Sequence, residues 1–370
     1  MARPLARVKT GSAGKKENWT LVPDHGWGAS LMKAKESAGP RALEPAFLEG
    51  EMTARKCVTF FPILLALALC QPLTAQVGGG IRWSMDRPDS HGPISLTDER
   101  TLAAGQFELG VKYINHRFEG QGIGTDSLPV SQVLTMFDVS PTVMTTRGAE
   151  VNLLVGLTSH LTLSATGTFV QKKMDHLGNI EGEPNLLLYY QTEALGPEDV
   201  KVSALYNIFD DNGIRVHLHG GVSIPIGAID SGDETPGSLA TETQLPYQQQ
   251  LGSGTFDVLP GVTASIQNEM ASLGFQWKAA IRMGENDRTW ALGDLYETAL
   301  WAGFNASDWV SASLGVQYSR WGNVEGLDPD LDAFVSPANS TLAQAGWRVE
   351  LPVGVNFVLP EGRFGGHRFG

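Results

Sequence analysis

The sequence is poor in cysteine, in long apolar runs and in positive charge, and each shortage excludes a class of protein. Only Cys57 and Cys70 occur among 370 residues. After residue 75, no stretch approaches the roughly 18 apolar residues that a membrane-spanning helix needs. Acidic residues outnumber basic ones by 40 to 27. Nucleic acid repels a chain of this charge, so we expect no nucleic-acid partner.

Both cysteines lie in a stretch with the features of a secretory signal peptide. Arg55 and Lys56 precede an apolar run that ends at Cys70, and small residues lie before and at Ala75. This arrangement predicts a signal peptide over residues 52–75 with cleavage after Ala75. The exported chain then has no cysteine, which excludes disulfides, thiolate metal sites and cysteine nucleophiles. A lipoprotein cysteine at Cys70 is disfavoured, because Leu69 stands where a small residue is needed.

The first 51 residues show no clear apolar period and are rich in Gly, Pro and Lys. Because a signal peptide normally begins its chain, we interpret Met52 as the true start and residues 1–51 as a mis-called, disordered extension. Without residues 1–75, 17 basic residues face 34 acidic ones. Residues 76–104 are expected to form a periplasmic or lumenal segment before the main domain, residues 105–370.

Ten stretches of alternating apolar and polar residues run from Gly105 to Pro360. One of them places Val216 and Leu218 on its apolar face. Stretches of about 10 residues are long enough to cross a bilayer as tilted strands. Outer-membrane barrels also join such strands by short turns at one end and longer loops at the other. We therefore predict an all-β fold, an antiparallel transmembrane β-barrel with ten strands present.

The connections between these stretches alternate in length. The strongest turn signal is Asn212-Gly213, because both residues tolerate the positive φ angles of a tight hairpin. Long connections are expected at residues 119–141, 174–199, 227–253, 284–292 and 325–344. Every long connection then lies at the same end of the barrel.

If the apolar faces meet lipid, the charged residues between them line the lumen. An Arg or Lys on the lipid face costs about 2–4 kcal/mol near the bilayer midplane, which settles the direction of the two faces. The lumen-facing, pore-lining candidates are Lys201, Arg215, His217, His219, Lys278, Arg282, Arg348 and Glu350. The sequence leaves open whether this lumen conducts or is packed.

Metal sites and catalytic sites have little support. His217 and His219 are weak candidates for a metal, since both project from one strand face, but no third ligand is identifiable. Asp328, Asp330 and Asp332 are suitable Ca²⁺ ligands, yet the loop lacks the Gly and the distant Glu of a calcium loop, which favours a solvated acidic loop. Hydrolase and zinc-protease motifs are absent. We expect no enzymatic activity and no cofactor.

A series of short motifs carries a resemblance to a known family. They lie at residues 161–163, 169–176, 202–206, 221–226, 229–230, 245–247, 250–257, 284–288, 309–314 and 321–326. In this order they resemble the outer-membrane β-barrel family assigned to the MetA pathway of phenol degradation as transporters. The resemblance implies an outer membrane of a Gram-negative-type bacterium and a transporter or pore for small hydrophobic or aromatic solutes. It also implies two partners besides the solute, namely membrane lipid and the outer-membrane assembly machinery.

The chain departs from this family in two respects. Family members are often rich in Met and His around the second strand, where this chain has fewer. They also continue beyond the position of Gly370 to about twelve strands, an even number that such barrels favour. We therefore expect a barrel truncated at its C-terminus. The alternative function is a non-conducting structural or metal-binding surface protein, with residues 76–104 filling the lumen.

Overall fold

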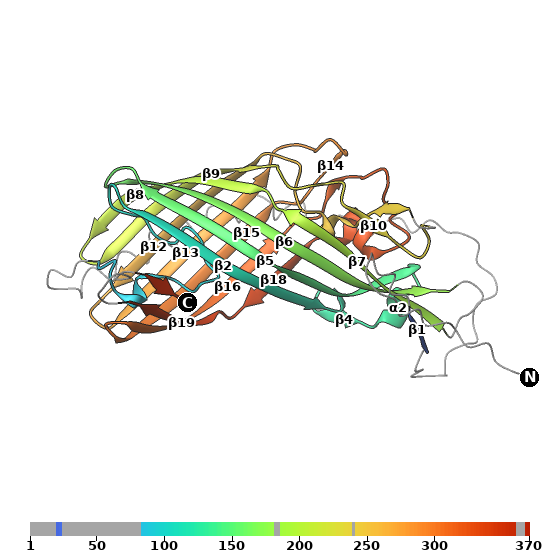
Figure 1. The fold of residues 1–370 in the computed structure, drawn as a ribbon, viewed down its shortest axis with the longest axis horizontal. Coiled ribbons are helices and arrows are strands. Elements are labelled where there is room, and N and C mark those ends of the chain that lie inside the picture. The colour runs from blue at the N-terminus through green and yellow to red at the C-terminus, as the bar shows by residue number, and fades with distance from the viewer. Residues whose placement is uncertain (1–19, 24–82, 181–185, 239–240, 360–366) are drawn as a thin grey trace, which may run out of the picture. The chain divides into compact units, whose positions relative to one another are not determined.

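One large antiparallel sheet organises the described part of the chain (Figure 1). The computed structural model describes residues 20–23, 83–180, 186–238, 241–359 and 367–370. The long strands of the sheet are β2 (Phe107–Glu119), β5 (Val139–Gly156), β6 (Leu161–Asn179), β7 (Leu186–Pro197), β8 (Val200–Asp211), β9 (Ile214–Ile224), β12 (Asp257–Gln267), β13 (Ala271–Arg282), β15 (Leu295–Ser307), β16 (Val310–Trp321), β18 (Gly346–Glu350) and β19 (Val353–Val358).

Two pairs of these strands each act as one interrupted strand. β7 and β8 follow each other along the same edge of β6. β18 and β19 do the same along β16, and the break contains Pro352, which has no N–H to donate to a ladder. Counted in this way, the described residues form ten long strands, and each pairs with its neighbours in sequence. The prediction of an all-β, antiparallel fold with ten strands is confirmed.

Short turns and long loops lie at opposite ends of the sheet (Figure 1). The predicted hairpin turn is present, with φ values of 51° at Asn212 and 75° at Gly213. The loop predicted over residues 174–199 is wrong in extent, because the ladder between β6 and β7 continues to the pair Asn179–Leu187. The predicted loop includes the whole of β7, whose residues Leu186–Tyr190 are all apolar and therefore show no alternation. Backbone pairing does not require that pattern, and Lys173 and Glu193 form an ion pair across the two strands at 3.0 Å.

The long loops contain short elements of their own. These are β3 (Gln121–Ile123), β4 (Asp126–Leu128) and α2 (Val130–Val133) in the first loop, β10 (Gly232–Glu234), β11 (Glu242–Gln244) and η2 (Tyr247–Gln249) between β9 and β12, β14 (Trp290–Ala291) between β13 and β15, and β17 (Glu325–Gly326), η3 (Pro337–Asn339) and η4 (Thr341–Ala343) between β16 and β18. Within the described ranges, no helix is long and apolar enough to cross a membrane.

The first and the last of the ten long strands, β2 and β18/β19, do not pair with each other among the described residues. The short strand β20 (Arg368–Phe369) pairs with the far end of β19. Toward the long loops the two edges approach, since the guanidinium of Arg348 lies 5.4 Å from the ring centre of Phe118. The expected truncation of the barrel stays a prediction.

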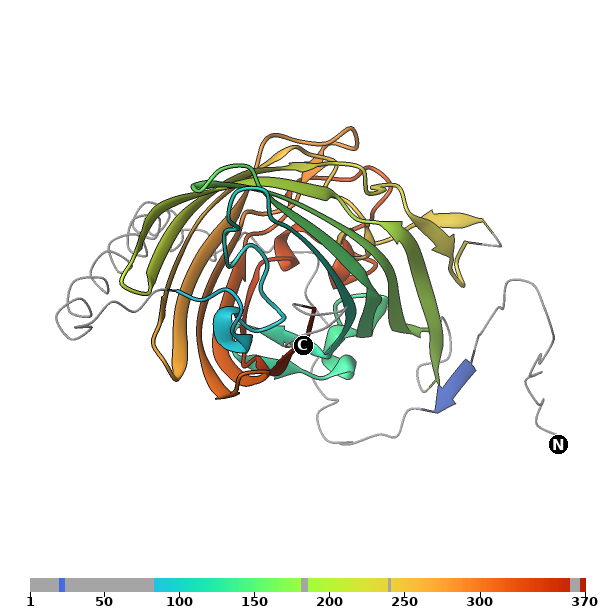
Figure 2. The ribbon, with the colours of Figure 1, turned by 60° about the vertical axis from the view of Figure 1, so that its left-hand side comes forward.

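Residues 83–104, which we call the inner segment, precede β2 and lie within the curl of the sheet (cyan in Figure 2). They include η1 (Pro88–Ser90). The predicted signal peptide lies outside the described residues. So does the predicted extension, except for β1 (Thr20–Pro23), which borders β7 in the sheet.

Candidate functional site

The residues predicted to line the lumen share one face of the sheet. Along one line of register partners, His219 is followed by Gly261, Lys278, Glu297, Ser319 and Arg348 on successive strands. Register partners project to the same side of a sheet, and side chains alternate sides along each strand. The same reasoning places Lys201, Arg215, His217, Arg282 and Glu350 on that side. We call this side the inner face, because the inner segment contacts it.

The opposite, outer face is apolar and exposed. On β2, the exposed residues Phe107, Leu109, Val111 and Tyr113 alternate with half-buried residues of the inner face. Exposed apolar residues continue at the outward positions of β5, β9, β16 and β19, for example Leu153, Leu218, Leu314 and Val353. Apolar area on this scale over so many strands is unusual for a soluble surface.

His217 and His219 stack against each other, with ring centroids 4.7 Å apart. His217 Nε2 donates to the backbone oxygen of Asp98 at 3.0 Å, and His219 Nε2 bonds Thr263 Oγ1 at 2.7 Å. Both Nε2 atoms therefore already have a protein partner. In the described part of the chain, no third His, Cys, Asp or Glu completes a group that could hold a metal ion.

Most of the predicted inner charges are paired within the wall. Arg215 lies 3.0 Å from Asp210, and Arg282 forms an ion pair with the buried carboxylate of Asp257. Arg348 and Glu350 pair with each other at 3.1 Å. Lys201 stays exposed. The inner face therefore carries both charge signs, in pairs that span one or two strands.

Lys278 differs from these residues, because it meets the inner segment instead of the wall. Its ammonium donates to Thr97 Oγ1 at 2.8 Å and to the Thr97 backbone oxygen at 3.3 Å. Gln276 Nε2 donates to the same backbone oxygen at 3.1 Å. Across the described residues, no carboxylate lies within ion-pair distance of Lys278.

Wall side chains that were not singled out in the sequence also bind the inner segment. With the segment residue that each one binds, they are Lys112 (Leu96), Thr162 (Leu102), Ser164 (Asp98), Gln267 (Ser84), Ser272 (Asp89) and Gln276 (Thr97). Except for Lys112, these residues are uncharged, so a search for charges and histidines passed over them. Their position in the sequence could have identified them, because each one occupies an inward-facing position in the alternating pattern of its strand.

Two apolar clusters fix the inner segment against the same face. Leu96 packs with Ala299 and Trp301. Leu102 packs with Leu154 and Leu205. Met85, also in the inner segment, packs against the Leu102 cluster, so apolar contacts hold the segment alongside the polar ones.

A buried polar pair lies within the inner segment itself. His91 Nδ1 donates to Glu99 Oε1 at 3.0 Å. Burial, aided by the charge of Arg100, lowers the pKa of His91 to about 3. Burial acts to raise the pKa of Glu99, but the hydrogen bond from His91 and the nearby positive charges outweigh it and hold that pKa at about 2. At neutral pH a neutral imidazole therefore donates to an ionised carboxylate.

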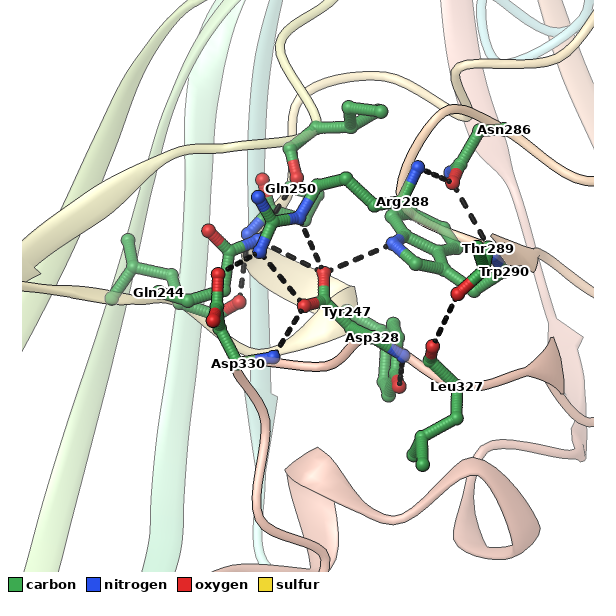
Figure 3. A network of polar contacts seen from close by, with 12 residues as sticks. Gln244, Tyr247, Gln250, Asn286, Arg288, Thr289, Trp290, Leu327, Asp328 and Asp330 are labelled. Carbon is green, nitrogen blue, oxygen red and sulfur yellow. Dashed lines mark hydrogen bonds and ion pairs between the residues drawn. The ribbon is translucent and has the colours of Figure 1, made fainter.

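The long loops at the other end are joined by a polar network (Figure 3). Arg288 Nε and Nη2 donate to the two carboxylate oxygens of Asp328 at 2.7 and 2.8 Å. Trp290 Nε1 donates to Asp328 as well, at 3.1 Å. The backbone N–H of Asp328 donates to the hydroxyl of Tyr247, whose ring packs edge-on against Trp290. The network thus links the loops that follow β9, β13 and β16.

This network corrects the interpretation of the acidic loop. Asp328 is fully buried, so it is not part of a solvated loop, and Arg288 occupies both of its carboxylate oxygens, so it is not free for Ca²⁺. The hydrogen bonds from Arg288 raise the pKa of that arginine further. They also outweigh the effect of burial on Asp328 and lower its pKa. Asp330, in contrast, is 65% exposed, as a solvated carboxylate should be.

The chain resembles solved structures, but no sequence comparison finds a relative. No protein-family model and no curated protein matches the chain. Among solved structures, the chain is similar to an outer membrane channel from Pseudomonas putida F1, with 12% sequence identity and a TM-score of 0.47, over 70% of this chain and 85% of that one. A similarity of this size supports no statement about function.

Proposed function

We propose that this protein is an outer-membrane channel for small solutes. The observation that carries the proposal is the opposite character of the two faces of one sheet. On β2 the exposed outer face is Phe107, Leu109, Val111 and Tyr113, while Lys112 on the inner face pairs with Glu150 at 3.0 Å. Such a sheet is stable where lipid covers one side and polar groups or water cover the other.

The outer membrane is the favoured location, since it is where strands of this kind are found. The predicted signal peptide supplies the export step. Membrane lipid, the assembly machinery and a small solute are the partners that this function requires. No catalytic residue or cofactor is part of the proposal.

Small hydrophobic or aromatic molecules are the proposed solute class, and this part rests on the family resemblance alone. The test is swelling of liposomes that contain the purified protein. We expect faster entry of small phenolic solutes than of sugars of the same mass. Equal rates for both would reject the solute class while leaving the channel in place.

The channel itself is tested in planar bilayers. Stable conductance steps are expected, and Lys201→Gln should change their ion selectivity because Lys201 is an exposed cation on the inner face. A matched control is Arg320→Gln, an exposed cation whose register partner Trp347 lies on the outer face. A selectivity change of the same size in both variants would show that the inner face is not the conducting path.

A second candidate is a non-conducting surface protein with a filled lumen. The inner segment favours it, because that segment occupies the inner face at several strands. Only His217 and His219 favour a metal-binding role for this candidate, and the Nε2 atoms of both already bind protein groups. Silent bilayers from folded, inserted protein would support it over the channel.

A further inference from the structure

The wall holds the inner segment mainly by the segment's own backbone. Backbone groups bound by wall side chains occur at Ser84, Met85, Arg87, Asp89, Leu96, Thr97, Asp98 and Leu102. The donors and acceptors come from β2, β6, β9, β12, β13 and β20. These hydrogen bonds are not part of the ladders between strands. They can therefore break one by one while the strands stay paired.

One attachment is a clamp at Thr97 and Asp98. Gln276 and Lys278 hold Thr97 from β13, while His217 from β9 holds the backbone oxygen of Asp98. Ser164 on β6 donates to the Asp98 carboxylate at 2.5 Å. Asp98 itself has a φ of 60°, a left-handed conformation that is costly for a residue with a side chain. Three strands thus hold a strained turn of the segment in place.

A hinge joins the segment to the sheet. Residues 103–106 separate Leu102 from β2, and three of them, Ala103, Ala104 and Gly105, are small. Gly105 has a φ of 78°, which glycine adopts at no steric cost. The N–H of Gly105 donates to the backbone oxygen of Gly156 at 2.8 Å, so the pivot is itself fixed to the wall. Rotation about these small residues would move the segment while β2 stays in its ladder.

The inner segment, like the inner face of the wall, carries both charge signs. The segment carries the carboxylates of Asp86, Asp89, Asp98 and Glu99 against the guanidiniums of Arg87 and Arg100. Lys278 donates its hydrogen bonds to Thr97 and forms no ion pair with a carboxylate of the described residues. Departure of the segment would free the Lys278 ammonium on the inner face, beside its register partner Glu297.

We propose that residues 83–104 act as a movable plug, which closes the channel in this structure and opens it by releasing the Thr97–Asp98 clamp and turning about Gly105. This inference rests on the proposed channel function and adds its gate. It predicts that a covalent bond between the segment and the wall abolishes conduction, and that loosening the clamp promotes it.

The first test is a disulfide lock in the full chain. A Cβ placed on Gly303 would lie 3.3 Å from the Cβ of Asp89, near the separation found in disulfides. The variant Asp89→Cys with Gly303→Cys is made in a background of Cys57→Ser, Cys70→Ser and Ser272→Ala, the last to clear the hydroxyl next to that position. A second lock, Asp98→Cys with Ser164→Cys, uses side chains already in contact. The single-cysteine variants, given the same oxidant, are the controls.

Conductance in planar bilayers is the readout, with the disulfide verified by mass spectrometry. We expect the oxidised locks to conduct at least tenfold less than the same proteins after reduction, with no redox effect in the single-cysteine controls. The clamp variant Gln276→Ala should spend more time open than the wild type. If oxidised and reduced locks conduct equally, the plug is disproved and the channel stands. If every folded, inserted variant is silent, including Gln276→Ala, the channel itself is disproved and the plug with it.

Discussion

Arg288 and Asp328, 40 residues apart in sequence, face each other with two parallel hydrogen bonds of 2.7 and 2.8 Å. Asp328 is fully buried, whereas the Arg288 side chain is 22% exposed. Bidentate pairing of this kind fixes orientation as well as distance. It therefore fastens the loop after β13 to the loop after β16.

Replacing Asp328 by Asn should loosen this loop cluster. The change leaves the Arg288 charge without its bidentate partner, at a cost of about 2 kcal/mol, less than a fully buried pair because Arg288 reaches solvent. We expect proteolysis of the loops in the folded protein to become about 30-fold faster, if cleavage follows local opening. Asp330→Asn is the matched control, and its exposed ion pair should contribute less than about 1 kcal/mol. Equal sensitivity in the two variants would contradict the role given to Asp328.

Acid should weaken the docking of the inner segment. His91 has a pKa of about 3 in the docked segment, against an ordinary value of 6.5, so the undocked form binds more protons and is favoured as the pH falls from 6.5 toward 3. Glu99, Arg100 and Arg368 are the charged groups that act on it. Each pH unit in this range should raise the open fraction by up to about tenfold.

The pH dependence is measured as the open fraction in bilayers between pH 7 and pH 3. Glu99 has a pKa of about 2 in the docked segment against 4.5 ordinarily, so it adds to the response only below about pH 4.5. The variant His91→Gln keeps a hydrogen-bond donor toward Glu99 without the titration. Its response should therefore begin near pH 4.5. An unchanged response above that pH would show that His91 is not the group concerned.

A charge on the outer face should destabilise the protein in lipid. Val316 on β16 is 46% exposed on that face, and its neighbour Gln317 projects to the inner face. Val316→Arg should cost about 2–4 kcal/mol if the position lies near the bilayer midplane. Gln317→Arg should cost markedly less, because the inner face already holds polar groups. The urea midpoint of unfolding of each variant in lipid vesicles measures this cost. A larger loss of stability in Gln317→Arg than in Val316→Arg would show that lipid does not cover the outer face.

Export should remove the predicted signal peptide, residues 52–75. Cleavage after Ala75 predicts a mature chain that begins at Gln76 and lacks both cysteines. Mass spectrometry of protein from the outer-membrane fraction measures the new terminus. Recovery of full-length chain from the cytoplasm would contradict both the signal peptide and the proposed location.

Strand count and facing could be predicted from the sequence, because the period of two is a local property. Val216 and Leu218 alternate with His217 and His219 in the chain itself, and the sheet only confirms which side each occupies. Asn212-Gly213 likewise needed no tertiary information, since its backbone preference is intrinsic. The extent of β6 and β7 was missed, because those strand ends are held by partner backbones and cross-strand pairs such as Lys173–Glu193.

What the sequence by itself determined is therefore the all-β fold, its ten strands and the two faces of the sheet. Only the tertiary structure decided what those faces touch. No local pattern links Thr97 to Lys278, or Arg288 to Asp328, since these partners are far apart in sequence and meet only after the strands have curled and the loops have folded. Alternation depends on the geometry of one strand, whereas each of these contacts depends on the position of several strands at once.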